Sequence, residues 1–514
     1  MEAYKGYLRA EVEELRAKGK GFLDGTVSRV ELRGFSGGFG SYAQSEDGKF
    51  MIRLRTPSGI VTKEHFNLIL DYAKNANLEK VHLTTRQAVQ IHDLTIDQVC
   101  DMMKDAIDHN LFTRGGGGHF PRNVALSPMA GVDPEEVFDV TPYACQVGDY
   151  FFRNATTYKL PRKLKVAFSS GAADTAGATV NDMGFIGVLS DDKPMFRMWL
   201  AGGMGNNPSP GILYDELVEP KEVLYYVEAM IQLFMAEGDY ENKGKARTRY
   251  IVKRMGEPAF IECYKKHLAK VREEYTFEGI EPVVVKPLEE VPESEHPMML
   301  AQRQEGKFTA ILHPICGQLN VKDGERIRAF VEELPEAELR LSMDEALYVR
   351  NLTKDQAEML LESMEGSMMM TPIQMSVSCV GTPTCEVGVN QSQRLCRSVI
   401  EAVEEASLVF GNLPQMFISG CPNCCARHAA AGLGFAGRKI TVDGEKKEAF
   451  TCYVGGKVGM DLTVMVESCG TILAEDIPGM VVELGRMLED QDKEYMDAVA
   501  DGSVMAIIEK YFVA

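Results

Sequence analysis

The chain has 514 residues, of which 45% are hydrophobic and 25% are charged, and its net charge is −20. This length exceeds what a single hydrophobic core supports, so we expect at least two packed domains, and the composition is that of a folded globular protein. The net negative charge disfavours nucleic acid as a partner. It also disfavours an anionic substrate, unless a local cationic pocket overrides the overall field.

The amino-terminal segment, residues 1–22, mixes charged residues throughout and lacks the apolar centre of a signal peptide. No later run approaches the roughly 20 apolar residues that a membrane span needs. The twelve cysteines are crowded toward the C-terminal third, which suits a metal site better than a disulfide framework. We therefore expect a cytoplasmic protein with reduced thiols and without a membrane partner.

Two segments recur further along the chain at one constant offset. KFMIRLRTPSGIVT from Lys49 matches KFTAILHPICGQLN from Lys307, and LTTRQAVQIHDLTIDQV from Leu83 matches LSMDEALYVRNLTKDQA from Leu341. Each copy has a strand–helix–strand–helix pattern, which indicates a small α+β unit with an antiparallel sheet. We predict an α+β fold, internally duplicated about a pseudo-twofold axis, with two ferredoxin-like half-domains and two larger α+β domains.

The expected units follow from the repeat and from a Pro- and Glu-rich stretch between its copies. They are an N-terminal extension (1–45), the first half-domain (46–112), a larger domain (113–277), a linker (278–303), the second half-domain (304–368) and a second larger domain (369–514). Carrying the same offset into the larger domains pairs Cys421 with Lys163 and Cys379 with Pro121. This register predicts that equivalent positions carry cations in one half and thiols in the other.

The stretch 83–92 is predicted to be one strand. Alternation at period two then places four polar side chains on one face: Thr84, Arg86, Gln90 and His92. A solvated face of a half-exposed strand explains this pattern as well as a binding surface does. The second copy does not keep the set, so only the first copy offers it.

Four cysteines have the spacing of ligands: Cys379, Cys385, Cys421 and Cys425. Zinc sites prefer close pairs of cysteines, which the wider first spacing fits poorly, so a [4Fe–4S] cluster is the better interpretation and zinc the alternative. We expect the segment after Cys425 to be helical, with its N-terminus stabilising an anionic cluster. We interpret the neighbouring Cys424 as a packing residue.

Together these motifs resemble the sirohaem-dependent sulfite and nitrite reductases. The resemblance rests on the cysteine motifs and on LTTRQAVQIH, PRNV (121–124), LPRKLK (160–165), NDMGF (181–185) and AGGMG (201–205), which span most of the chain in the family's order. It implies an enzyme whose two larger domains bind sirohaem and a [4Fe–4S] cluster. It also implies that all four cysteines hold the cluster and that the Cys425 sulfur is shared with the sirohaem iron.

By the same resemblance, the oxyanion substrate is held by Arg53, Arg122, Lys163 and Lys165. Their convergence would supply the local positive field that the whole chain lacks, and they would donate protons as oxygens leave as water. The alternative is that these are four unrelated surface cations. The resemblance further implies that sirohaem contacts Thr84, Arg86, Gln90, His92, Arg162 and Cys425, with the arginines pairing its carboxylates. The glycine run 115–118 is either a flexible turn or a close backbone approach to a large ligand.

Sulfite and nitrite are both small anions that such an enzyme reduces with six electrons. Lys165 favours sulfite, because the resemblance implies that ferredoxin-dependent nitrite reductases tend to carry Asn there and a second cation suits the bulkier oxyanion. The stretch 127–143 resembles nitrite reductases as well as some bacterial sulfite enzymes. We expect sulfite as the substrate, with nitrite as the alternative.

Electrons are expected to come from another protein, a ferredoxin or a flavoprotein. The sequence contains no second cysteine cluster and no flavin motif, and GLGFAG (432–437) is not preceded by a predicted strand, as a dinucleotide fingerprint would be. Two non-enzymatic alternatives are an iron–sulfur electron relay and a redox sensor that uses Cys424 and Cys425. Neither of them needs the cations or the polar face of the predicted strand.

Overall fold

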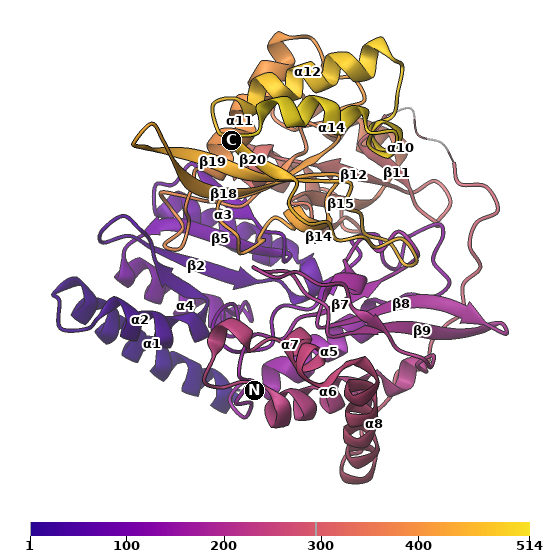
Figure 1. Ribbon diagram of the computed structural model, residues 1–514. Helices are drawn as coiled ribbons and strands as arrows, with labels where there is room; N and C mark the ends of the chain where they lie inside the picture. The colour runs from indigo at the N-terminus through magenta and orange to yellow at the C-terminus, as the bar shows by residue number, and fades with distance from the viewer. Residues whose placement is uncertain (1, 293, 295, 514) are drawn as a thin grey trace.

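The structure is a computed structural model that describes residues 2–292, 294 and 296–513. Met1 and Ala514, at the ends of the predicted first and last units, lie outside the described residues, as do Glu293 and Glu295 of the predicted linker. Four five-stranded sheets form the centre of the molecule, and most helices lie around them (Figure 1). Within the described residues, no helix is both long enough and apolar enough to cross a membrane.

Two of the sheets are antiparallel and confirm the ferredoxin-like halves. The first has the strand order β1 (Ser41–Ala43), β2 (Phe50–Arg55), β5 (Ala88–Leu94), β4 (Lys80–Leu83) and β13 (Gln318–Asn320). The second has the order β11 (Met299–Ala301), β12 (Phe308–Leu312), β15 (Leu347–Leu352), β14 (Glu338–Leu341) and β3 (Ile60–Val61). Their helices are α3 (Lys63–Asn75), α4 (Ile96–Asp108), α9 (Val321–Glu332) and α10 (Lys354–Ser363).

Each half contributes one edge strand to the sheet of the other half. Strand β13 of the second half pairs with β4 of the first, with Leu319 opposite Val81. In return, β3 of the first half pairs with β14 of the second, with Val61 opposite Leu339. The exchange pairs exposed sheet edges with each other, which removes a site of aggregation and ties the two halves into one unit.

Helices α4 and α10 begin with the same capping box. The Thr95 hydroxyl accepts from the backbone N–H of Gln98, and the Gln98 side chain accepts from the backbone N–H of Thr95. Thr353 and Gln356 repeat this arrangement. Two donors that the helix leaves unpaired are satisfied each time, which explains why both copies of the repeat keep the Thr and Gln pair.

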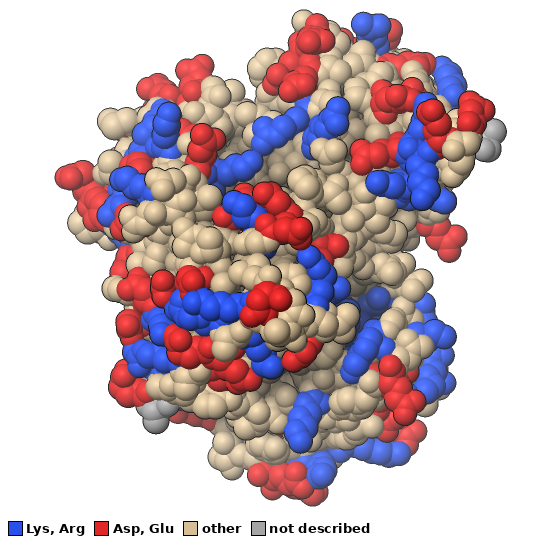
Figure 2. All heavy atoms as spheres, turned by 90° about the vertical axis from the view of Figure 1, so that its left-hand side faces the viewer, with Lys and Arg blue, Asp and Glu red and all other residues tan. Residues whose placement is uncertain are grey.

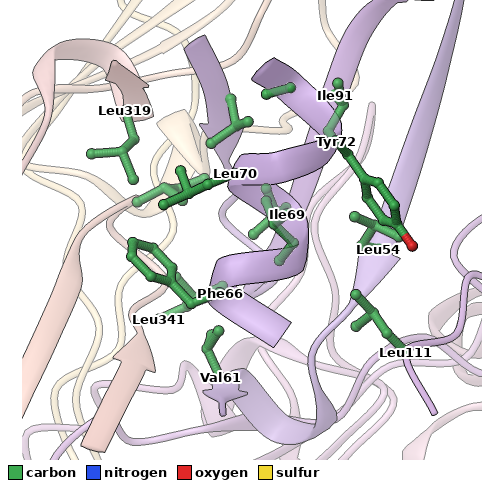
Figure 3. Close-up of a cluster of buried hydrophobic side chains, with 14 of the residues drawn as sticks. Leu54, Val61, Phe66, Ile69, Leu70, Tyr72, Ile91, Leu111, Leu319 and Leu341 are labelled. Atoms are coloured by element: carbon green, nitrogen blue, oxygen red, sulfur yellow. The ribbon is translucent and has the colours of Figure 1, made fainter. Parts of the chain in front are cut away.

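The two halves share one hydrophobic core. Figure 3 shows Leu54 and Ile91 of the first sheet, Phe66 and Leu70 of α3, and Leu319 and Leu341 of the second half within one cluster of buried side chains. The amino-terminal helices α1 (Glu2–Leu23) and α2 (Arg29–Ser36) add Leu8, Val12 and Leu32 to this core.

The other two sheets are mixed, with parallel strands followed by antiparallel ones. The third sheet has the strand order β6 (Ala125–Leu126), β7 (Val166–Ser169), β8 (Met183–Ser190), β9 (Lys193–Leu200) and β10 (Ile212–Leu213). The fourth sheet has the order β16 (Val377–Ser378), β17 (Met416–Ser419), β18 (Leu433–Val442), β19 (Glu445–Val454) and β20 (Gly470–Leu473). The accompanying helices are α5 (Thr141–Arg153), α6 (Val223–Glu237), α7 (Thr248–Met255), α8 (Glu257–Glu274), α11 (Ser392–Glu405), α12 (Ile477–Asp490), α13 (Tyr495–Ala500) and α14 (Ser503–Ile508).

The loops that follow β7 and β17 have the same backbone conformation. Asp174 and Cys424 have φ values of 51° and 55°, and Gly177 and Arg427 have φ values of 64° and 62°. A short 3-10 turn then follows in each loop, Ala178–Val180 and His428–Ala430. The duplication therefore extends into the larger domains.

This equivalence corrects two expectations. Cys421 lies two residues after β17, as Gly171 lies after β7, so its counterpart is Gly171 and not Lys163. Cys379 directly follows β16, as Ser127 follows β6, so its counterpart is not Pro121. The segment after Cys425 is a 3-10 turn of three residues rather than a helix, because the left-handed backbone of Cys424 and Arg427 is incompatible with an α-helix.

The predicted strand 83–92 is a hairpin. β4 ends at Leu83 and β5 begins at Ala88, with a tight turn between them. The Thr84 hydroxyl accepts from the backbone N–H groups of Arg86 and Ala88, and Gln87 has a φ of 51°. Thr84 and Arg86 therefore belong to a turn, and only Gln90 and His92 lie on the strand.

The exchanged strand β13 gives a test of the shared core. Leu319 is 1% exposed, so Leu319→Ala should lower the free energy of unfolding by about 2–4 kcal/mol through lost burial and a residual cavity. Thermal and urea unfolding would measure this loss. Leu462→Ala, at a side chain that is 62% exposed, is the control and should change stability by less than about 0.5 kcal/mol. Equal effects of the two changes would contradict a core shared between the halves.

Candidate functional site

The four cysteines with ligand-like spacing lie in one neighbourhood, on two loops beside the fourth sheet. Cys379 directly follows β16, and Cys421 and Cys425 follow β17. Burial raises the pKa of Cys379, Cys385 and Cys421, and the nearby Cys425 sulfur raises each of them further. Cys425 is exposed, whereas Cys421 is buried and the other two are partly buried.

This arrangement differs from a site for a single metal ion. Among residues 2–292, 294 and 296–513, no three His, Cys, Asp or Glu side chains lie close enough to hold one ion. Four thiols that share a neighbourhood without meeting at a point fit the corners of a [4Fe–4S] cube. The backbone N–H of Gly420 already donates to the Cys379 sulfur at 3.2 Å, as it would to a thiolate ligand. The donor set therefore fits the cluster better than zinc.

Cys424 points away from this group. It is 2% exposed and packs in an apolar cluster with Val180, Met204, Ala429 and Ala430. Its sulfur lies 3.9 Å from the thioether sulfur of Met204. Its place in the structure is that of the predicted packing residue.

Lys163 and Lys165 come directly before β7, and they flank Leu164, which bridges to Pro121. Burial lowers the pKa of Lys163 to about 7, with Arg247 and Arg122 adding repulsion and Cys425 opposing it. Burial also lowers the pKa of Lys165 well below its ordinary value, and Arg86, Lys163 and Arg247 lower it further. Cations that repel one another in a buried place are arranged to receive an anion.

Asp182 is the carboxylate that partly offsets this charge. It is fully buried and accepts from Arg247 Nη2 at 2.7 Å, from the Thr248 hydroxyl at 2.5 Å and from the backbone N–H of Lys165 at 2.8 Å. Its negative charge raises the pKa of Lys165 but does not restore it to its ordinary value.

The glycine run 115–118 wraps the other two predicted substrate ligands. The carbonyl of Gly116 accepts from Arg53 Nη1 at 2.5 Å, and the carbonyl of Gly118 accepts from Arg122 Nη2 at 3.0 Å. A Cβ at Gly117 would lie 2.3 Å from the Gly37 carbonyl. The backbone approach that the glycines permit is therefore to the protein itself, and it holds both guanidinium groups in place. Burial lowers the pKa of Arg122 to about 9.

The cations and the cysteines come from different halves of the chain and face each other. The Cys425 sulfur raises the pKa of Lys163, and the Arg53 guanidinium lowers the pKa of Cys385. The Thr85 hydroxyl donates to the Cys425 carbonyl at 2.8 Å. On the outside, by contrast, Lys and Arg side chains are mixed with Asp and Glu over the face that Figure 2 shows. The positive charge that this acidic chain needs in order to attract an anion is thus concentrated where the cations and the cysteines meet.

The predicted sirohaem contacts divide into a first group that belongs to the hairpin turn, Thr84 and Arg86, and a second group beside the cations, Gln90, His92 and Arg162. Arg86 is occupied by protein acceptors, the Asn123 carbonyl at 2.8 Å, Asn181 Oδ1 at 2.9 Å and the Val166 carbonyl at 2.7 Å. Together with Thr84, it orders the hairpin turn. Gln90 lies between Arg53 and His92: with its oxygen toward the guanidinium it accepts at 2.6 and 2.9 Å, and its nitrogen donates to His92 Nε2 at 2.9 Å.

Arg162 belongs with the second group, because it directly precedes Lys163. Burial lowers the pKa of Arg162, and Arg247 lowers it further. Gln90, His92 and Arg162 therefore remain the predicted contacts whose side chains belong to the same charged region as Arg53 and Lys163.

Arg247 and Arg249 belong to the site but were missed from the sequence. Both are 5% exposed, and Nε and Nη1 of Arg249 have no hydrogen-bond partner among the described residues. A Cβ at Gly203 would lie 2.8 Å from Arg247 Nη2, and one at Gly205 would lie 3.2 Å from Arg249 Nη2. The glycines of AGGMG thus make room for this pair. These two glycines were the feature of the sequence that could have indicated the pair. A buried guanidinium without an acceptor is a binding site for an anionic group.

Comparison with known proteins agrees with this geometry. Residues 42–108 match the nitrite/sulfite reductase ferredoxin-like half domain, and residues 117–271 match the nitrite and sulphite reductase 4Fe-4S domain. Both matches are to models of the nitrite and sulfite reductase family, which this chain resembles in both kinds of domain. It is therefore an oxidoreductase, and a simple electron relay or sensor does not account for it.

Individual relatives are distant but match over most of their length. A ferredoxin–nitrite reductase of Synechococcus elongatus is 24% identical over 85% of this chain and 86% of its own. A sulfite reductase [ferredoxin] of Mycolicibacterium paratuberculosis is 23% identical over 94% of this chain and 88% of its own. The solved structure of the Mycobacterium tuberculosis NirA protein has the same fold, with a TM-score of 0.79 and 22% identity over 93% of this chain and 91% of its own.

The cofactors of the family are sirohaem and a [4Fe–4S] cluster, and the residues of this chain fit both. Four thiols in one neighbourhood suit the cluster. The macrocycle bears several carboxylates, and the buried cations with the unpaired Arg249 nitrogens supply matching donors.

The electrostatics of Lys163 predict a pH-dependent stability of the cofactor-free protein. The pKa of Lys163 is about 7 in the folded protein and 10.5 for a free lysine. Between pH 7 and 10.5, Lys163 is protonated in the unfolded chain but largely neutral in the fold. The fold is therefore least stable, by the full cost of burying the charged lysine, below about pH 7, and this cost disappears as the pH rises toward 10. Lys163→Met should therefore raise the unfolding midpoint by about 2 °C at pH 7 and by much less at pH 10.

Calorimetric scans of the cofactor-free protein across this pH range would measure the difference. Lys159→Met, at an exposed lysine, is the matched control and should show no such trend. A gain that stays constant with pH would mean that Lys163 is charged and solvated in the fold.

Proposed function

We propose that this protein reduces sulfite to sulfide with six electrons at a sirohaem iron next to a [4Fe–4S] cluster. The observation that supports this best is the meeting of two sets of residues from different halves of the chain. Arg53, Arg122, Lys163 and Lys165 concentrate positive charge, and they face the loops of Cys379, Cys385, Cys421 and Cys425. An oxyanion and an electron source would thus meet in one place.

The chain's own residues have distinct parts in this proposal. Sirohaem and the cluster, when bound, would transfer electrons from the donor protein to the substrate. Arg53 and Arg122, held by the carbonyls of the glycine run, bind the oxyanion and fix its orientation in a partly desolvated pocket. Lys163 has a pKa of about 7, so it both attracts an anion and releases a proton near neutral pH. Each oxygen that leaves as water consumes two protons, which makes such a donor necessary.

Lys165 carries the argument for sulfite. It is the second lysine of the pair, and its pKa is held well below the ordinary value by burial and by Arg86 and Lys163. An oxyanion of greater negative charge relieves more of this repulsion, so the pocket favours sulfite over the singly charged nitrite.

Nitrite is the second candidate. The name ferredoxin–nitrite reductase is carried by several relatives at 24–25% identity, including those of Synechococcus elongatus, Arabidopsis thaliana and Zea mays. Nitrite fits the same cations, because it needs only to be held as a small anion at the same place.

We infer that a separate protein delivers the electrons, with ferredoxin as the first choice and a flavoprotein as the alternative. The names of the nitrite reductase and sulfite reductase relatives include ferredoxin. A reducing, cytoplasmic setting is part of the proposal, because it would keep the thiols available for the cluster.

Cys425→Ser tests the site itself. Because Cys425 is proposed to serve the cluster and the sirohaem iron together, this change should remove most of the bound iron and sulfide and the chlorin-like absorption band in the same preparation. Iron analysis and visible absorption of anaerobically purified protein would measure both. Cys263→Ser, at a partly exposed cysteine of α8, is the control. Retention of both cofactors by Cys425→Ser would refute the shared role of this sulfur.

Lys165→Asn tests the substrate. The proposal expects the wild type to have the higher kcat/KM with sulfite, and expects the variant to lose about tenfold or more of the sulfite-to-nitrite ratio through loss of one cation. Steady-state turnover with a chemically reduced donor, measured separately on the two anions, gives this ratio. Lys159→Asn is the matched control at an exposed lysine. If the ratio stays the same in Lys165→Asn, the choice of sulfite loses its basis.

A further inference from the structure

Cys452 and Cys469 are two thiols in contact that the proposed cluster site does not use. Cys452 lies on β19 and is fully buried, whereas Cys469 directly precedes β20 and is partly exposed. The backbone N–H of Cys469 donates to the Cys452 carbonyl at 3.0 Å, and the Cys469 thiol donates to the same oxygen at 3.2 Å. Because Gly470 is the ladder partner of Cys452, Cys469 and Gly470 both lie opposite Cys452, as in a β-bulge.

The equivalent place in the third sheet shows that the fold does not need thiols here. Met198 lies two residues before the end of β9, as Cys452 lies two residues before the end of β19. The backbone N–H of Tyr214 donates to the Met198 carbonyl at 2.8 Å, which is the contact that Cys469 makes to Cys452. Met198 and Tyr214 are buried core side chains. Larger side chains without a thiol therefore satisfy the packing of this place.

The two sulfurs differ in access and in acidity. A hydrogen bond from the Cys452 thiol lowers the pKa of Cys469, burial opposes it, and the backbone N–H groups of Cys469 and Gly470 lower it further. The contact with the carbonyl favours the protonated thiol, but the net pKa stays below the ordinary value. The same thiol contact and burial raise the pKa of Cys452 well above its ordinary value. An accessible thiol of lowered pKa beside a second thiol is typical of cysteines that react with oxidants.

The loop between the two cysteines, residues 455–468, contacts both sides of the proposed site. The backbone N–H of Val466 donates at 2.9 Å to the carbonyl of Ala429, in the turn that follows Cys425. The backbone N–H of Met460 donates at 2.9 Å to the carbonyl of Ala172, in the loop after β7. A covalent link between the ends of this loop would fix a segment that packs against the cysteine loop and against the third sheet's domain.

We propose that Cys469 and Cys452 are a modification site, at which a low-molecular-weight disulfide converts the two thiols into a reversible protein disulfide. The Cys469 thiolate attacks one sulfur of the reagent, which breaks the reagent's S–S bond, releases one thiolate and leaves a mixed disulfide on Cys469. Cys452 then loses its proton and attacks the Cys469 sulfur, which releases the second thiolate and closes the protein disulfide. The two electrons that the pair loses reduce the reagent to two thiols, and an excess of thiol reverses the reaction.

This inference does not depend on the proposed function, because neither cysteine is among the four proposed cluster ligands. Oxidised glutathione, added anaerobically to the holoenzyme, tests it. Trypsin cleaves after Lys447, Lys457 and Arg486, so the two cysteines fall into separate peptides, 448–457 and 458–486, each with one cysteine. After alkylation of the remaining thiols, mass spectrometry should find these peptides joined, and dithiothreitol should separate them. An unchanged far-ultraviolet circular dichroism spectrum shows that the link forms in the folded protein.

The single variants Cys452→Ser and Cys469→Ser separate the roles of the two sulfurs. In Cys452→Ser, Cys469 should keep glutathione as a stable mixed disulfide, because no second thiol displaces it. In Cys469→Ser, the buried Cys452 should stay unmodified. Cys263, a partly exposed cysteine whose pKa is raised by burial, is the comparison within the same chain. It should take up glutathione about tenfold more slowly than Cys469 does in Cys452→Ser.

Two results would overturn the inference. If peptides 448–457 and 458–486 of the wild type stay unlinked, whether or not Cys263 reacts, the two thiols serve only to pack the core. If Cys452 acquires glutathione in the folded Cys469→Ser variant, Cys469 is not the sulfur that attacks first. Neither result bears on the proposed function, which depends on turnover of sulfite and nitrite.

Discussion

The site depends on positive charge held away from water. Lys163, Lys165 and Arg122 have lowered pKa values because burial and mutual repulsion act in the same direction. Asp182 offsets only part of this charge through its bonds to Arg247 and to the Lys165 backbone. Such an arrangement costs stability in the absence of an anion and gains it when one binds. This explains how a chain with a net charge of −20 can attract a small oxyanion and an acidic macrocycle.

The two sides of the site, one with cations and one with cysteines, are built on equivalent parts of the duplicated fold. The loops after β7 and β17 keep the same left-handed positions, Asp174 with Cys424 and Gly177 with Arg427. In the first copy the Asp174 carboxylate binds backbone N–H groups of its own loop, whereas the second copy has cysteines around the same bends. The exchange of β3 and β13 fixes one half against the other. The relative placement of cations and thiols is thus a property of the shared core rather than of any single loop.

The sequence alone predicted the parts of the structure whose signals are local. The α+β fold, its duplication and the strand–helix–strand–helix order of each half follow from the periodicity of the side chains and from the repeated segments. The turn at 84–87 was missed because its sequence, TTRQ, lacks the Gly, Pro or Asn of ordinary turns. Its left-handed Gln87 is held instead by Leu126 and Leu341, which are far away in the chain.

The same limit explains the errors around the cysteines. Alanine-rich sequence after Cys425 favours a helix locally, but the loop is shaped by contacts such as Ala426 N–H to the Ser419 hydroxyl and Arg427 to Asp344. The constant offset of the half-domains fails beyond them, because insertions between the copies change the register. Arg247 and Arg249 were missed because their only signal, the glycines at 203 and 205, lies more than 40 residues away in the sequence, and their role arises where they meet these glycines and Asp182.

Electrons and protons would enter the proposed reaction from different sides of one pocket. The thiols approach from the fourth sheet, and Lys163 and Lys165 approach from the third, so neither set has to perform both tasks. Glu345 and His82 lie where the two halves meet, and each is paired in the repeat with a residue of different chemistry, Gln87 and Arg340. The Gln87 amide accepts from the backbone N–H of Leu126 and donates to two carbonyls, whereas Glu345 accepts from the backbone N–H of Ser378. The duplicated turn thus keeps one backbone contact while the side chain that makes it changes.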